Sequence, residues 1–188
     1  MKIVLVVLGV LVLLAVVLGG SLMGSRNELV QGRNAVDGAW AQVDVVLQRR
    51  ADMIPNLVET VKGFAKQEQE VIASVANARA ALGGARTPAD RIAANNQLDG
   101  ALSRLLVVVE NYPNIKSNEN FIRLQDELAG TENRIAVERR KYNETVQAYN
   151  TNIELFPKNI AASLFNFQRN DAYFKADTAA KEVPKVKF

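Results

Sequence analysis

The 188-residue sequence contains no cysteine and no histidine, and these two absences exclude much enzyme chemistry. Without cysteine the chain has no disulfide and no thiolate nucleophile. Without histidine it lacks the commonest general base and the commonest transition-metal ligand. Catalysis by serine or cysteine with a histidine partner is therefore excluded within this chain. Glycine-rich phosphate-binding loops and the acidic calcium-binding loop are also missing from the sequence. We expect no catalytic residues, no bound metal and no cofactor.

A dense run of basic charge is missing as well. The formal net charge is +3, and residues 1–157 carry 17 basic and 17 acidic side chains, so the excess lies in residues 158–188. A nucleic-acid-binding surface needs a basic stripe with aromatic side chains among the charges. We therefore expect no nucleic-acid partner.

The chain begins with an apolar run from Ile3 to Met23. As a helix this run would be about 30 Å long, which matches the hydrocarbon core of a bilayer. A cleaved signal peptide is the alternative, but its apolar region would be shorter and Leu18-Gly19-Gly20 matches a cleavage site poorly. We expect residues 1–24 to be a retained, single-pass transmembrane anchor. The few basic residues that flank it do not fix the side of the membrane on which the rest of the chain lies.

The residues after the anchor show the spacing of amphipathic helices. Apolar residues recur three, four or seven positions apart on one face: Val36, Trp40, Val43, Leu47 and Ile54. Arg50 falls on this same face, and Pro55 follows it. Because proline lacks an amide donor and crowds the preceding turn, we expect a kink or a helix end at Pro55. Helical spacing then resumes and continues to Leu82.

Turn and capping residues mark the later helices. The expected boundaries are a break at Gly83-Gly84, a start at Thr87-Pro88, a stop at Tyr112-Pro113, a cap at Ser117 for a helix over about 118–155, and a stop at Pro157. No stretch shows sustained period-two alternation. The sequence therefore predicts an all-α protein: the anchor, then an elongated antiparallel bundle of long helices over residues 25–165, then a basic, partly disordered tail over residues 166–188.

Two long blocks of this sequence resemble the LemA family of bacterial membrane-anchored helical proteins. The blocks are VDVVLQRRADMIPNLVETVKGF at 43–64 and YPNIKSNENFIRLQDELAGTENRIAVERRKYNETVQAYN at 112–150, and Trp40 and Phe156-Pro157 also fit. The resemblance implies one N-terminal transmembrane helix in the bacterial inner membrane, an antiparallel helical bundle and no established enzymatic activity. It further implies a link to magnetosome membrane formation in one branch, and members that often sit beside a membrane metalloprotease.

The candidate interface or joint residues gather around Pro55 and in the second block. They are Trp40, Arg49, Arg50, Asp52, Pro55, Asn56, Glu59, Glu132, Asn133, Arg134, Tyr142 and Asn143. In one interpretation Arg49 and Arg50 hold the joint by pairing with carboxylates such as Asp44, Glu59 or Glu132. In the other, these charges form a polar interface to a partner.

Two further groups of residues leave alternatives open. The mid-helix amides Asn133 and Asn143 favour buried hydrogen bonds that fix helix register, with a ligand site as the alternative. Towards the end of the chain, Ile160, Leu164, Phe165 and Phe167 predict a short amphipathic turn. The tail lysines together with Phe165, Phe167, Phe174 and Phe188 form either a second membrane contact or a disordered segment.

These observations predict a non-enzymatic, membrane-anchored scaffold that self-associates and organises or remodels the bilayer. Its expected partners are copies of itself and the lipid bilayer. The alternative is an adaptor or regulator of a membrane protease or another envelope partner. A hydrolase that uses Asp52, Glu59 and Glu132 is a third hypothesis, but no spacing pairs these carboxylates as acid and base.

Overall fold

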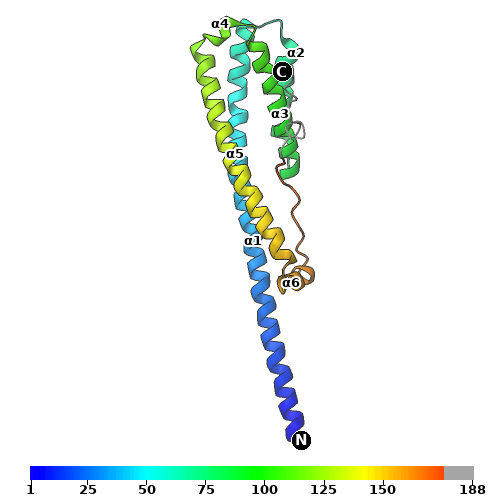
Figure 1. Cartoon of the computed structure of the whole chain (residues 1–188). Helices are drawn as coiled ribbons and strands as arrows, with labels where there is room; N and C mark the ends of the chain where they lie inside the picture. Colours follow the sequence, from blue (N-terminus) through cyan, green and yellow to red (C-terminus); the bar gives the residue numbers. More distant parts are fainter. Residues whose placement is uncertain (176–188) are drawn as a thin grey trace, which may run out of the picture. The chain divides into compact units, whose positions relative to one another are not determined.

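The computed structural model describes residues 1–175, and every regular element in this range is a helix (Figure 1). The helices are α1 (Lys2–Phe64), α2 (Gln69–Gly84), α3 (Pro88–Val109), α4 (Pro113–Lys116), α5 (Glu119–Glu154) and α6 (Lys158–Leu164). The all-α prediction is confirmed for this part of the chain. The remainder of the predicted tail, residues 176–188, lies outside the described residues.

Helix α1 passes through Pro55 without ending, so of the kink or helix end expected at this residue, the helix end is wrong. The helix ends instead at Phe64, and residues 65–68 form the turn to α2. Pro55 cannot donate to the carbonyl of Ala51, one turn earlier. That oxygen accepts a hydrogen bond from Arg79 Nε of α2 at 3.0 Å. A side chain from another helix therefore replaces the missing backbone bond.

Two compact units make up the described chain, and helices α1 and α5 contribute to both. Unit 1 contains Met1–Ala39 and Lys141–Asp171, and unit 2 contains Trp40–Arg140 and the described residues from Ala172 onward. Within unit 2, α5 runs antiparallel to α1, and α4 lies at the turn between α3 and α5 (Figure 1). The core of unit 2 draws on α1 to α5 and includes Ile54, Leu57, Val61, Val75, Leu82, Leu98, Leu105, Ile115 and Phe121.

Capping side chains begin helices α3 and α5. Thr87 Oγ1 accepts a hydrogen bond from the Asp90 amide at 3.1 Å, and Pro88 occupies the first turn of α3, as its sequence predicts. Helix α5 is capped by Asn118, whose Oδ1 accepts from the Phe121 amide at 3.1 Å, and the prediction of Ser117 is wrong by one residue. The short helix α4, just before this cap, was not predicted.

Unit 1 contains the apolar run and a small core beside its end. Side chains of the run from Ile3 to Leu18 are exposed, and this part of α1 is long and apolar enough to cross a membrane. The core consists of Leu29 with Ala161 and Ala162 of α6, and partly buried side chains surround it: Leu22, Ile153, Phe165 and Phe167. Helix α6 therefore packs on α1 directly after the apolar run.

Candidate functional site

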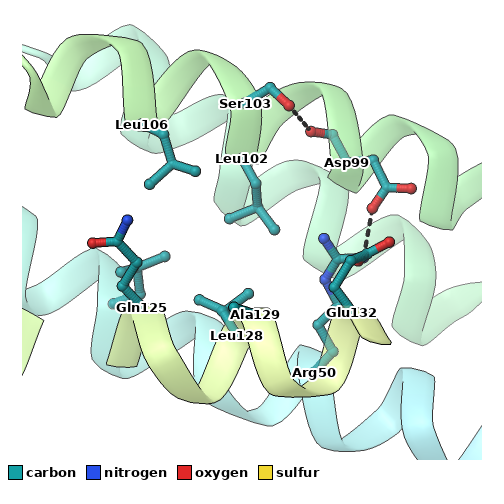
Figure 2. A pocket seen from close by; sticks show the side chains of 10 residues that line it. Arg50, Asp99, Leu102, Ser103, Leu106, Gln125, Leu128, Ala129 and Glu132 are labelled. Atoms are coloured by element: carbon teal, nitrogen blue, oxygen red, sulfur yellow. Dashed lines mark hydrogen bonds and ion pairs between the residues drawn. The ribbon is translucent and has the colours of Figure 1, made fainter. Parts of the chain in front are cut away.

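The candidate site is an ion-pair cluster around Arg50 in unit 2. Arg50 lies on the core face of α1, seven residues from Val43 and four from Ile54, and only 5% of its surface is exposed. Its NH1 group lies 2.5 Å from Asp99 Oδ1 of α3 and 2.8 Å from Glu132 Oε2 of α5. One buried guanidinium group therefore connects three helices, as Figure 2 shows. The planar, multi-donor guanidinium group suits this role because it can serve two carboxylates at once.

Asp99 is the second centre of the cluster. Besides Arg50, its carboxylate accepts from Asn95 Nδ2 at 3.0 Å and from Arg139 NH2 at 3.4 Å. Asn95 is fully buried, and Asp99 and Glu132 keep partial contact with solvent. Two guanidinium groups face two carboxylates, so the cluster has no net charge. This balance allows the core to hold Arg50, since an unpaired buried charge would be costly.

An apolar cavity of about 370 Å³ opens beside the cluster, between α1, α3 and α5. Leu57, Leu102, Leu106 and Leu128 give it apolar walls, and Arg50, Asp99 and Glu132 lie at one end (Figure 2). Both carboxylates are already paired with a guanidinium group. The cavity is therefore suited to an apolar side chain or small apolar molecule rather than to acid–base chemistry. No group of three or more metal-ligating side chains occurs within residues 1–175.

With this geometry in view, the chain can be compared with known proteins. The sequence model of the LemA family matches residues 39–188, which include all of unit 2. The chain belongs to the LemA family. It is a helical, membrane-associated member, with one N-terminal helix of sufficient length and hydropathy for an anchor.

Three relatives in the LemA family show how far the similarity extends. Protein LemA of Metamycoplasma hominis is 23% identical over 165 residues, which cover 87% of this chain and 73% of the relative. Magnetosome protein MamQ 2 of Paramagnetospirillum magneticum is 26% identical over 188 residues, covering 85% and 68%. Magnetosome protein MamQ of Magnetospirillum gryphiswaldense is 24% identical over 152 residues, covering 67% and 56%.

The two neighbouring arginines of the LemA block have different surroundings. Arg50 is buried and paired with Glu132, which confirms one of the predicted ion pairs. Arg49, one position earlier on the helix, is exposed. The other two predicted carboxylates have different partners: Asp44 pairs with Arg91 of α3 at 2.6 Å, and Glu59 pairs with Lys62 at 2.8 Å. Arg50 alone of the predicted pair therefore joins the helices at this site.

The remaining candidate residues lie in several places. Asp52 accepts from Gln48 at 2.8 Å on the surface of α1. Trp40 stacks on Phe174, with ring centroids 6.2 Å apart. Exposed residues are Pro55, Asn56, Asn133 and Arg134, whereas Tyr142 is fully buried and Asn143 is half-buried. The carboxylates Asp52, Glu59 and Glu132 thus have three different partners, and the structure does not join them into one hydrolytic site.

The prediction that Asn133 fixes register from a buried position is wrong, because this residue is exposed. The buried amides are Asn95 and Asn150. Asn150 exchanges hydrogen bonds with the backbone of Asn170, at 2.8 and 2.9 Å. Sequence reasoning missed Asn95 and Asp99, although their spacing of four places both on one face of α3 beside Leu98 and Leu102.

Proposed function

We propose that this chain is a non-enzymatic, membrane-anchored scaffold that assembles with copies of itself at the bilayer, and that its N-terminal helix is retained. One observation carries the proposal. Helix α1 contains the exposed apolar run and continues without a break into the residues that build the core of unit 2. Each copy is then held in the plane of the membrane, where confinement raises the local concentration of its partners.

A shallow hollow between α1 and α5 in unit 2 is the surface we assign to self-association. Val45 and Val137 in it are 66% and 41% exposed. The other residues that line it are Gln42, Val46, Asn133, Arg134 and Glu138. An apolar centre with a polar rim is the usual composition of a protein interface. It also gives the exposed Asn133 and Arg134, both predicted as interface residues, a role on the surface.

Counting copies of the labelled full-length protein in native membrane tests the proposal. We expect assemblies of several copies for the natural sequence and single copies for the double variant Val45→Glu, Val137→Glu. The matched control is Val107→Glu in α3, because Val107 is also apolar and 69% exposed but lies outside the hollow. The control should assemble normally. Single copies of the natural sequence at every membrane density would contradict the proposal.

The cavity beside Arg50 favours a second candidate function, that of an adaptor or regulator of a membrane protease or another envelope partner. Its leucine walls could receive an apolar side chain of such a partner. Leu106 is 42% exposed at this cavity, so Leu106→Glu should abolish co-purification of an identified membrane protease and leave self-assembly intact. Unchanged co-purification would exclude the cavity as the docking site. Arg50 is unsuited to this test because it supports the fold.

A further inference from the structure

Four large apolar side chains are exposed in a short segment of unit 1, which we call the foot segment (residues 155–164). The exposed fractions are 54% for Leu155, 78% for Phe156, 48% for Ile160 and 65% for Leu164. The segment includes α6, whose buried side chains are the small Ala161 and Ala162. A surface helix in water normally turns its large apolar side chains inward. The foot segment does the reverse, which indicates that its outer surroundings are apolar.

The position of the foot segment on α1 identifies those surroundings. Ala161 and Ala162 pack against Leu29, and Leu22 borders the same cluster. Lys158 Nζ lies 2.6 Å from Glu28 Oε2. The contacts therefore involve residues 22–29 of α1, and the apolar run ends at Met23. At 1.5 Å per residue, the whole contact lies within about 9 Å of the end of the run along the helix. In a bilayer that α1 crosses, the contact begins at the edge of the hydrocarbon core and extends across the headgroup region, which is about 5–8 Å thick on each side.

The charges of the foot segment fit this location. Lys158 is the one ionisable side chain among residues 155–164. It is paired with Glu28 and also donates to Asn152 Oδ1 at 2.9 Å. The segment can therefore enter the interface without burying an unpaired charge, which would be costly. The surface of the segment is otherwise apolar apart from the amide of Asn159 and the hydroxyl of Ser163.

The phenylalanines that follow the foot segment face in another direction. Phe165 and Phe167 pack beside the small core of unit 1, and their rings lie 5.5 Å from the guanidinium carbons of Arg26 and Arg33. Phe174 stacks on Trp40, and Phe188 lies outside the described residues. Three of the four phenylalanines predicted as membrane contacts thus pack within the protein. Among the aromatic rings of the described residues in unit 1, that of Phe156 is the most exposed.

We propose that the foot segment is a second membrane contact, with Leu155, Phe156, Ile160 and Leu164 inserted into the lipid at the interface next to the anchor. Interfacial helices of this kind bury their apolar face about 5–10 Å into the boundary between headgroups and acyl chains. Two contacts on one chain fix the rotation of α1 about its own axis in the bilayer. The proposal shares the membrane anchor with the proposed function and does not require self-association.

The absence of cysteine allows a direct test by site-directed spin labelling of the full chain. Single variants Phe156→Cys, Ile160→Cys and Leu164→Cys are labelled with a nitroxide and reconstituted into vesicles of phosphatidylethanolamine and phosphatidylglycerol. Collisions with oxygen, which concentrates in lipid, are compared with collisions with a water-soluble nickel chelate. Leu11→Cys within the apolar run is the lipid control, and Val107→Cys is the exposed apolar control in unit 2. Circular dichroism verifies that each variant remains helical.

We expect oxygen collisions to exceed nickel collisions at residues 156, 160 and 164, as at Leu11, and the reverse at Val107. The difference should persist when the vesicles are diluted with empty lipid. Nickel accessibility at the three positions equal to that at Val107 would overturn the proposal while leaving the anchor intact. Protection that disappears on dilution would assign the surface to a second copy and also overturn it. Nickel accessibility at Leu11 would show that the apolar run is not in lipid. That result would overturn both proposals, because both depend on the anchor.

Discussion

At the scale of single residues, the fold depends on a few arginines that each satisfy groups from other helices. Arg50 serves Asp99 and Glu132, Arg91 pairs with Asp44, and Arg79 donates to the Ala51 carbonyl. A pair of this kind contributes little compared with an apolar substitute, but removing one member leaves an uncompensated charge in the core. We therefore expect a single substitution of any of these arginines to destabilise the fold.

The first prediction compares the two neighbouring arginines. Arg50→Ala should lower the free energy of unfolding by about 3 kcal/mol, because it leaves Asp99 and Glu132 facing each other beside the cavity. We place the value at the lower end of the range for buried pairs, since both carboxylates retain some contact with water. Arg49→Ala is the matched control and should change the value by less than about 0.5 kcal/mol. Denaturant titration followed by circular dichroism measures both free energies of unfolding. Equal losses for the two variants would contradict the assignment of Arg50, and not Arg49, as the arginine that supports the fold.

The second prediction concerns pH and Tyr149. Burial raises the pKa of this phenol above its ordinary value, the positive charge of Arg33 lowers it, and the negative charge of Asp37 raises it. The hydroxyl donates to the Gln168 carbonyl at 3.1 Å. Because the folded pKa is above the unfolded value of about 10, the neutral phenol stabilises the fold below that pH. This contribution is lost as pH rises through the folded pKa.

The variant Tyr149→Phe tests this dependence. Its melting temperature should fall less than that of the natural sequence between pH 9 and 11. Parallel pH profiles for the natural sequence and Tyr149→Phe would show that this phenol is not the titrating group.

At the scale of elements, helix α1 continues through Pro55. Pro55 is exposed, whereas its neighbour Ile54 is buried in the core of unit 2, so packing holds the helix on both sides of the ring. Locally, the proline costs one backbone hydrogen bond, because the carbonyl of Ala51 loses its donor. Arg79 Nε supplies a donor from α2. Arg79 thus connects α2 to α1 at the position where α1 lacks a backbone hydrogen bond.

The third prediction is a coupling between Pro55 and Arg79. Arg79→Met should cost about 1–2 kcal/mol in the natural sequence, because it leaves a covered carbonyl without a donor. In a Pro55→Ala background the backbone amide of residue 55 can donate to Ala51, so the same change should cost less than about 0.5 kcal/mol. A double-mutant cycle measured by denaturant titration gives the difference. Equal costs in the two backgrounds would show that Arg79 does not replace the missing bond.

The sequence predicted the helices well because a period near 3.6 depends only on neighbours along the chain. The same periodicity placed Arg50 on the core face with Leu47 and Ile54. It could not identify Asp99 as a partner, since spacing within α3 says nothing about which helices meet. Of the kink or helix end expected at Pro55, the helix end was wrong for the same reason. Rules for proline describe a local cost, and the side chain that offsets it comes from a later helix.

At the scale of the whole molecule, the apolar run of α1 is long and apolar enough to cross a membrane, and we propose that it anchors the chain in lipid. The fourth prediction is that a chain lacking residues 1–21 stays helical but partitions into the aqueous fraction, while the full chain remains in the membrane after carbonate extraction. This deletion retains Leu22, which borders the core of unit 1. Sedimentation followed by immunoblotting measures the partition. A truncated chain that stays fully in the membrane would show that other residues suffice for anchoring.

Unit 1 is built from two segments that are distant in the sequence, residues 1–39 and residues 141–171. During synthesis the first segment leaves the ribosome long before the second exists. The surface of α1 around Leu29 is therefore bare when it emerges, and α6 covers it only near the end of translation. If α1 is the proposed anchor, it can therefore enter the bilayer before unit 1 closes, and a chain that stops before residue 158 would lack its α6 cover.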